Sequence, residues 1–250
     1  MSLAVAAAAW IEIVIAVHPS PGDSQEDRVI LLIMTRIIFP TSNPILMPPA
    51  QGLTRGVELS KMYGMSLTPI DVARVLSRAK VRYVLIGAHA INLYTGKPRA
   101  TQDVDVVTDS PAKASKAIRF AFPNLTVEDH PAVVRFKDGN VEVLDLIKAK
   151  SGKLFRKVLQ LITTSEIDGD PIIVPTAEAA LALKFHSMTN PTRPIDDRMQ
   201  DAVDFSRAAK SQRNVDQALL KELGELVYSG GGEALLKLLD DARKGRRLEI

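Results

Sequence analysis

Hydrophobic residues recur at helical spacing over residues 67–79, the first strongly patterned segment of the chain. The segment opens with Thr68, Pro69 and Asp71, which match an N-cap, a first helical residue and the third helical position of a capping box. The apolar residues that follow lie on one face of a helix with 3.6 residues per turn. The pattern therefore predicts an amphipathic helix that begins at Pro69.

Further along, short apolar runs alternate with helical patterns and with turn residues. The pattern predicts, in chain order, a strand over 81–87, a short helix over 88–96 that ends at Gly96, a strand over 102–109, and a helix over 110–122 with Ser110 as its N-cap. Two β-hairpins are predicted next, over 132–149 around Asp138-Gly139-Asn140 and over 161–175 around Asp168-Gly169. Between them, the basic run from Lys148 to Lys157 is typical of a solvated loop, with a role in holding RNA or triphosphate as the alternative.

From Thr176 onward the pattern is helical. Helices are predicted over 176–188, over 195–210, from Asn214 with Gln217 completing a capping box, and after the break at Gly230-Gly231-Gly232. The chain is thus expected to contain a small α/β half with a mixed sheet and an all-helical C-terminal half.

The first sixty residues do not follow these patterns. Residues 3–17 are apolar but contain Glu12, and no Lys or Arg precedes them as it would in a signal peptide. This run and the apolar run 28–39 are both shorter than the roughly 20 residues of a membrane span, so no stable membrane association is expected. We predict a poorly ordered extension over 1–62, and a strand or helix packed on the domain is the alternative.

Composition narrows the chemistry more than it narrows the fold. The 250 residues contain no cysteine, which excludes disulfides and cysteine zinc sites and fits a cytoplasmic protein. The four histidines are scattered, so a histidine-rich metal site is not expected. A hydrophobic content of 46% allows a sizeable core, and a net charge of +3 permits an anionic partner without requiring one.

Two carboxylates stand out in the strand predicted over 102–109. Side chains alternate across a strand, so Asp103 and Asp105 are expected on one face while Val104 and Val106 point to the core. Two such carboxylates suit a hard cation such as Mg²⁺, which takes oxygen ligands and pairs with phosphates. Asp145, on an otherwise apolar strand, is the best candidate for a third ligand, and Glu142 beside the turn is the weaker one.

A strand-to-helix turn precedes these carboxylates. Gly87 ends one predicted strand and Ala88 begins the next helix. Small residues at such a turn let backbone N–H groups approach phosphate oxygens. The turn and the two aspartates together favour a phosphate-bearing ligand with a divalent cation.

The string IGAHAINLYTGKPRATQDVDVV, residues 86–107, combines these features. It resembles the nucleotidyltransferase (polymerase beta-like) superfamily, whose signature is a hydrophobic residue, Gly, then Gly or Ser, a short helix, and Asp-h-Asp-h, where h is hydrophobic. Within it, the string is most similar to the AbiEii/AbiGii toxin type and related minimal nucleotidyltransferases. The LALKFHSM and QDAVDF segments resemble that group's lysine helix and its Lys-Asp-x-x-Asp helix. The resemblance implies an α+β fold, with a small mixed-sheet nucleotidyltransferase core and flanking helices over 63–175 and a C-terminal helical bundle over 176–250.

The resemblance also implies a role for each matching residue. It places Asp103, Asp105 and Asp145 on the metal ions, Gly87 and Ala88 along the triphosphate, Arg99 and Thr101 beside the metal strand or a phosphate, Lys184 facing the nucleotide, and Asp201 next to Lys184. Two positions depart from the pattern. Ala88 replaces the second Gly or Ser, and Gln200 stands where the group often has a basic residue.

The implied activity is transfer of a nucleoside monophosphate from a nucleoside triphosphate (NTP) to an acceptor, with two Mg²⁺ or Mn²⁺ ions. The acceptor would be an RNA such as tRNA or a partner protein in a toxin–antitoxin pair. The competing hypothesis is a catalytically faded binding module or antitoxin, which the Ala88 departure favours. A plain DNA-binding protein is a distant third, because no recognition-helix pattern and no basic patch with interleaved aromatic residues is evident.

Each assignment also has a structural alternative. Asp103 and Asp105 would then be a solvated edge-strand pair, and Asp145 a surface residue. His89 is expected to have a structural role rather than a catalytic one. Lys184 could be a snorkelling surface lysine, and Asp201 and Asp204 a polar helix face.

Overall fold

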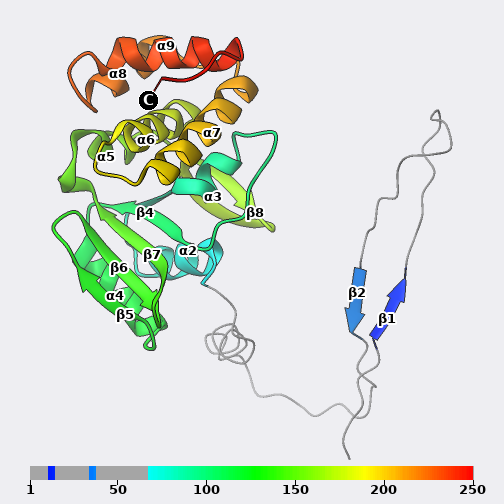
Figure 1. Cartoon of the computed structure of the whole chain (residues 1–250). Coiled ribbons are helices and arrows are strands. Elements are labelled where there is room, and N and C mark those ends of the chain that lie inside the picture. Colours follow the sequence, from blue (N-terminus) through cyan, green and yellow to red (C-terminus); the bar gives the residue numbers. More distant parts are fainter. Residues whose placement is uncertain (1–10, 15–33, 38–66, 250) are drawn as a thin grey trace, which may run out of the picture. The chain divides into compact units, whose positions relative to one another are not determined.

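The computed structural model describes residues 11–14, 34–37 and 67–249 (Figure 1). The chain divides into two units, 1–51 and 52–250. In the first, strands β1 (Ile11–Val14) and β2 (Met34–Ile37) form an antiparallel pair. Most of the extension predicted over 1–62 lies outside the described residues, so its poor order stays a prediction.

The second unit is built on a five-stranded mixed sheet. Its order is β3 (Tyr83–Ile86), β4 (Val104–Thr108), β7 (Val141–Lys148), β6 (Val133–Asp138) and β5 (Thr126–Asp129). Strands β4 and β7 are parallel, and the other neighbours are antiparallel. The sequence predicts the hairpin β6–β7 but misses β5, whose side chains are mostly exposed and lack an apolar pattern. The parallel pairing places Asp145 directly beside Asp105.

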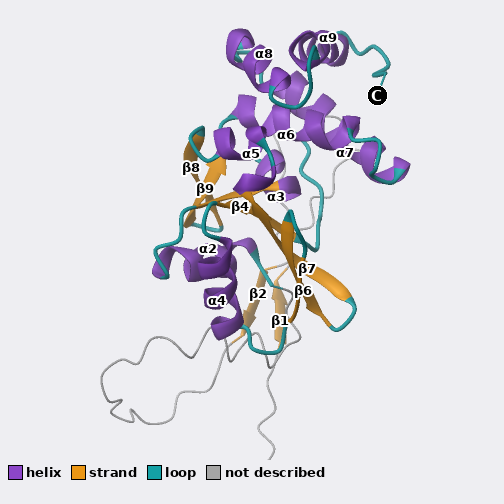
Figure 2. Cartoon of the chain, turned by 90° about the vertical axis from the view of Figure 1, so that its left-hand side faces the viewer, coloured by secondary structure: helices purple, strands orange, loops and turns teal. Residues whose placement is uncertain are grey.

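One face of this sheet is covered by α2 (Pro69–Arg78) and α4 (Pro111–Ala121), as Figure 2 shows. The capping box of α2 is present as predicted, with Thr68 and Asp71 each accepting the other's backbone N–H at 3.2 Å. Ser110 occupies the N-cap position of α4, but its hydroxyl donates to Asp109 instead of capping the helix. Val104 and Val106 of β4 point into the core beneath these helices, whereas Asp105 and Val107 point to the opposite face, where Val107 packs in the helical core.

A short helix, α3 (Gly87–Asn92), connects β3 to the loop before β4. Its last turn is followed by Leu93 as C-cap, so the prediction that Gly96 ends this helix is wrong. Asn92 fixes the loop instead, because its amide donates to the backbone carbonyl of Arg99 at 2.7 Å and accepts the N–H of Arg99 at 3.1 Å.

The C-terminal half forms a second core of packed helices above the sheet in Figure 1. These are α6 (Ala177–Thr189), α7 (Ile195–Ser211), α8 (Gln217–Glu225) and α9 (Gly231–Arg243). Helix α6 is buried over most of its surface, which explains its nearly uniform apolar sequence. The N-cap of α8 is Asp216, which accepts the N–H groups of Ala218 and Leu219, so the capping box predicted at Asn214 is wrong.

Two connecting elements complete the unit. The predicted second hairpin is present as β8 (Ile162–Ile167) and β9 (Asp170–Pro175). The segment Lys148–Lys157 is not a loop, because it contains a 3₁₀ turn (Ala149–Ser151) and most of α5 (Lys153–Val158), with Leu154 buried in the helical core. None of the described helices is long and apolar enough to cross a membrane.

Candidate functional site

The site begins where β3 turns into α3. Gly87 has a φ of +66°, a backbone conformation that residues other than glycine adopt only with strain. A Cβ atom at this position would lie 2.0 Å from Oδ2 of Asp105. Glycine is therefore needed here for two reasons, its left-handed backbone and the close approach of a carboxylate from β4.

Asp103 and Asp105 differ in their surroundings. Asp103 precedes β4 and is exposed, and its Oδ1 accepts a hydrogen bond of 2.5 Å from the hydroxyl of Thr101. Asp105 lies within β4, where burial raises its pKa to about 7, with further contributions from the negative charges of Asp103 and Asp145. The nearby cations Lys184 and Arg193 act in the opposite direction but do not cancel this effect. The described surroundings, above all burial, therefore disfavour the ionised form of the Asp105 carboxyl group.

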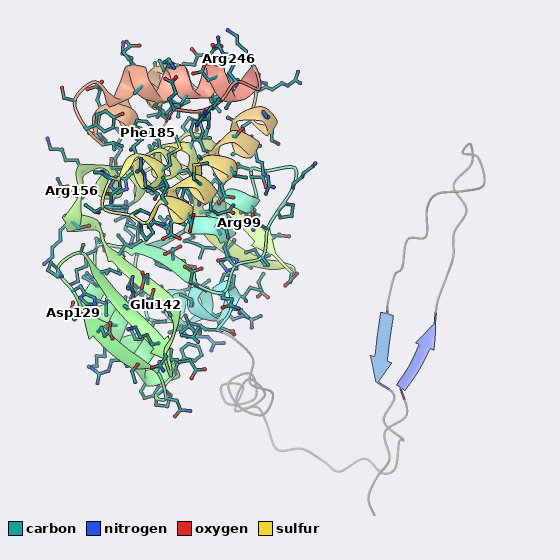
Figure 3. All side chains as sticks on the ribbon, viewed as in Figure 1. Arg99, Asp129, Glu142, Arg156, Phe185 and Arg246 are labelled. Carbon is teal, nitrogen blue, oxygen red and sulfur yellow. The ribbon has the colours of Figure 1, made fainter. Side chains whose placement is uncertain are left out.

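Lys184 is buried between two carboxylates of α7. It is 6% exposed, and its Nζ donates to Oδ1 of Asp201 at 2.7 Å and to Oδ2 of Asp204 at 2.9 Å. Nε of Arg99 lies 3.2 Å from both oxygens of Asp204 (Arg99 is labelled in Figure 3). Gln200 also donates to Asp204, at 3.1 Å. This network ties the loop before β4 to helices α6 and α7, and it excludes the surface alternative for Lys184, Asp201 and Asp204.

A further cation approaches the same carboxylates from the loop between α6 and α7. Nη2 of Arg193 forms an ion pair of 3.3 Å with Oδ2 of Asp201. This oxygen is buried, and within the described part of the chain it has no hydrogen-bond partner. Arg193 is itself considerably exposed, at 42% of its side chain, so it can reach a ligand without first leaving a buried position.

These groups surround one cavity of about 250 Å³. All of the residues implied by the sequence resemblance line it, with the exception of Asp145: Gly87, Ala88, Arg99, Thr101, Asp103, Asp105, Lys184 and Asp201. Apolar walls come from β3, α3, α5 and α6. The cavity therefore combines three cations, from Arg99, Lys184 and Arg193, with the carboxylates at the start of β4.

Asp145 is placed differently. It lies beside Asp105 in the sheet, but both of its carboxylate oxygens accept hydrogen bonds from Arg135, at 2.9 Å from Nε and 2.8 Å from Nη2. Among the described residues, no set of three or more His, Cys, Asp or Glu side chains is arranged to hold a metal ion. The role of Asp145 as a third metal ligand stays a prediction.

The donor chemistry at Asp103 and Asp105 fits a hard cation. Both residues offer carboxylate oxygens, which Mg²⁺ and Mn²⁺ prefer. The raised pKa of Asp105 also fits a bound cation. Burial and the neighbouring carboxylates disfavour the ionised form of Asp105, and a cation would favour it. Asp145 fits the ion only where Arg135 no longer binds its oxygens.

His89 does not line the cavity and belongs to its surroundings. Burial lowers its pKa, while the charges of Asp103 and Arg99 act in opposite directions and are smaller effects. His186 does line the cavity, and its ring packs edge-on against Phe155 at a centroid distance of 5.2 Å. Burial, followed by the charge of Arg193, lowers the pKa of His186. Both imidazoles are therefore less easily protonated than a solvated histidine.

No protein-family model matches the chain, and no curated protein matches it. Similar solved structures are nucleotidyltransferase-like proteins. An antigenic nucleotidyltransferase-like protein from Paracoccidioides brasiliensis is 20% identical over 68% of this chain and 89% of its own, with a TM-score of 0.41.

Two antibiotic-modifying proteins have the same kind of similarity. The lincosamide antibiotic adenylyltransferase LnuA, with lincomycin bound, is 18% identical over 58% of this chain and 98% of its own, with a TM-score of 0.41. The antibiotic-resistance factor ANT(2'')-Ia is 13% identical over 78% of this chain and all of its own, with a TM-score of 0.45.

Sequence reasoning missed three charged residues of the site. The sequence does carry a signal for Asp204, because its spacing of three from Asp201 places both residues on one side of α7. Arg193 precedes α7 in a polar loop and gave no signal. Arg135 alternates with apolar residues in β6, but its partner could not be named without the strand register.

Proposed function

We propose that this protein transfers a nucleoside monophosphate from an NTP to an acceptor and releases pyrophosphate. The observation that carries the proposal is the pairing of opposite charges within one cavity. Asp105, which lies against Gly87, and Asp103 line this cavity, and Arg99, Lys184 and Arg193 contribute cations to the same space. A triphosphate with a divalent cation has the complementary charge distribution.

Each cation is held for binding by a defined contact. Asp201 and Asp204 orient the side chain of Lys184, and Asp204 together with Asn92 fixes Arg99. The guanidinium of Arg193 pairs with Asp201 and is considerably exposed, so it can turn toward a phosphate. In this proposal the three side chains bind triphosphate oxygens, and the backbone N–H groups of Gly87 and Ala88 bind them from the β3–α3 turn.

Asp103 and Asp105 would hold Mg²⁺ or Mn²⁺. When bound, the ion supplies charge neutralisation at the phosphates and a lower pKa for the attacking hydroxyl. Thr101 contributes by holding Oδ1 of Asp103 through its hydroxyl, which limits the rotamers of that carboxylate. A two-ion arrangement, as the sequence resemblance implies, would also use Asp145.

The acceptor and the biological setting are proposed from the sequence resemblance alone. An RNA end such as that of tRNA, or a side chain of a partner protein, would receive the nucleotide in a toxin–antitoxin pair of the AbiEii/AbiGii type. A cytoplasmic location is part of the same proposal.

The test is incubation of the purified full chain with each labelled NTP, Mg²⁺ and total tRNA or cell extract. Incorporation of label is expected with at least one NTP, and Asp103→Ala should abolish it without loss of folded protein. Asp109→Ala is the matched control, since Asp109 is an exposed carboxylate just beyond the other end of β4 and lies outside the cavity. Absence of incorporation with all four NTPs, with a known nucleotidyltransferase active in parallel, would contradict the proposal.

A binding module without turnover is the second candidate. Two observations favour it, the Ala88 side chain at the β3–α3 turn and the pairing of Asp145 with Arg135. Thermal unfolding with Mg²⁺ and ATP separates the two functions. A rise in melting temperature without incorporation into any acceptor would support the module, and a rise together with incorporation would support the enzyme.

A further inference from the structure

A row of charged side chains crosses four strands of the sheet on the face opposite α2 and α4. Asp105 on β4 pairs in register with Asp145 on β7, Asp145 with Arg135 on β6, and Arg135 with Glu128 on β5. Directly paired residues point to the same face of a sheet. The row therefore places Arg135 beside Asp145, on the strand away from Asp105.

Arg135 makes a two-point contact with Asp145. Nε donates to Oδ1 at 2.9 Å and Nη2 donates to Oδ2 at 2.8 Å, while Nη1 donates to Glu142 at 2.8 Å. The side chains of Arg135 and Asp145 are 29% and 20% exposed, so water only partly screens the pair. Side-by-side guanidinium–carboxylate contacts of this kind are among the strongest ion pairs in proteins.

A β-bulge creates this contact. Lys137 pairs with Glu142 and Phe136 pairs with Leu144, so Val143 is an extra residue on β7. With a regular register counted from the turn, Arg135 would face Leu144 and the side chain of Asp145 would point to the apolar face. The bulge thus brings Asp145 to the same face as both Asp105 and Arg135.

We propose that Arg135 is a positioning residue that serves as the resident counter-ion of Asp145. A first divalent ion then binds at Asp103 and Asp105, and a second ion at Asp145 has to displace the guanidinium of Arg135. The inference rests on the proposed function, because it concerns the cations of the same site.

The physical reason is competition for the same oxygen atoms. Each oxygen of Asp145 already accepts a charge-assisted hydrogen bond, and the positive charge of Arg135 repels an approaching cation. Neither condition applies to Asp103, whose hydrogen bond comes from the neutral hydroxyl of Thr101. A divalent ion is therefore expected to bind more easily at Asp103 and Asp105 than at Asp145.

The experiment is a titration of the full chain with Mn²⁺, in which the unbound ion is measured by electron paramagnetic resonance. The wild-type protein is expected to bind one ion more tightly than a second. Arg135→Gln should tighten the second ion by at least about fivefold, and Arg135→Lys should have a smaller effect, because an ammonium cannot contact both oxygens in the same way. Unchanged or weaker binding of the second ion in Arg135→Gln would overturn the proposal.

Arg74→Gln is the matched control. Nη2 of Arg74 contacts both oxygens of Asp170 at 2.8 Å in an ion pair that contributes nothing to the cavity lining. This variant should bind Mn²⁺ as the wild type does. A change equal to that of Arg135→Gln would show a general effect of lost positive charge and would refute the specific role of Arg135.

Asp145→Asn provides a second test that does not depend on Arg135 variants folding. It should remove the weaker ion and leave the affinity of the tighter ion within about threefold. Loss of both ions would overturn the proposal, since Asp145 would then already be a ligand of the first ion. If Mn²⁺ binds as expected but no NTP is turned over, the proposed function fails alone. If label is incorporated but Arg135→Gln leaves Mn²⁺ binding unchanged, the inference fails alone.

Discussion

Gly87 and Asp105 are packed so tightly that neither position tolerates an additional atom between them. A Cβ on Gly87 would lie 2.0 Å from Oδ2, 2.9 Å from Cγ and 3.0 Å from Cβ of Asp105. The turn that is proposed to bind phosphate and the strand that is proposed to bind a cation are therefore positioned by one contact. A change on either side shifts both.

Gly87→Ala should damage the fold and the site together. The new Cβ must move the Asp105 carboxylate, and alanine at a φ of +66° adds backbone strain. We expect a loss of about 2 kcal/mol or more in the free energy of unfolding, measured by urea denaturation. Gly96→Ala is the control, because a Cβ there would meet no other described residue within 4 Å. A variant as stable as Gly96→Ala would show that the contact does not matter.

Asp105→Asn should stabilise the metal-free protein at high pH. Folding raises the pKa of Asp105 from 3.8 to about 7, so the folded chain binds an additional proton between these values. The free energy of unfolding of the wild type therefore falls as the pH rises through this window, and the penalty is complete above pH 7. At about 1.4 kcal/mol per pKa unit, the variant should be more stable by up to about 4 kcal/mol at pH 8 and equally stable near pH 4.

The measurement for Asp105→Asn is thermal and urea unfolding in EDTA from pH 4 to pH 8. Asp138→Asn, at the exposed turn of the β6–β7 hairpin, is the control and should follow the wild type. If the stability difference between Asp105→Asn and the wild type did not change with pH, the burial and the charged surroundings described for Asp105 would not raise its pKa.

Asp204→Asn should destabilise the helical half. The substitution removes the carboxylate shared by Lys184 and Arg99, and it leaves Lys184 buried with one anion. Breaking a buried ion pair from one side costs about 3 kcal/mol or more. Asp197→Asn, on the exposed surface of the same helix, should cost little. Adding Lys184→Met to Asp204→Asn should cost less than the sum of the single changes, and strict additivity would argue against the network.

Asn92→Ala should loosen the loop that carries Arg99 and Thr101. The variant loses both side-chain hydrogen bonds to the backbone of Arg99. At about 1 kcal/mol for each of the two bonds, amide hydrogen exchange in the loop should accelerate by roughly thirtyfold. Asn124→Ala, in the exposed turn after α4, is the control. Unchanged exchange at Arg99 would show that Asp204 alone holds the loop.

Local signals in the sequence were sufficient for most elements of the second unit. The capping box at Thr68 and the turn at Asp138-Gly139-Asn140 depend on neighbouring residues only, and both are present as predicted. Predictions of helix caps were wrong where more than one nearby group could form the same hydrogen bond. Ser110 bonds to Asp109 rather than to its helix, and Asp216 takes the capping position expected for Asn214.

The site was predictable as far as it lies within continuous segments. Asp103 and Asp105 follow from strand alternation, and the proximity of Lys184 and Asp201 was implied by the sequence resemblance. The role of Arg135 could be predicted only with the register shift between β6 and β7, which no residue type indicates. The role of Arg193 could be predicted only with the packing of α6 against α7. Long-range contacts of this kind depend on the three-dimensional arrangement and not on local pattern.

The extra residue Val143 also constrains how the length of the β6–β7 hairpin can change. When two residues are inserted or deleted in the turn between Lys137 and Glu142, the side chains in the rest of β7 still point to the same faces of the sheet. A single residue gained or lost between the bulge and Asp145 would turn that aspartate toward Phe136 and Leu146, inside an apolar core. Related chains that keep this row of charged side chains are thus expected to vary in hairpin length at the turn. A sequence alignment that ignores the bulge would place the wrong residue opposite Asp145.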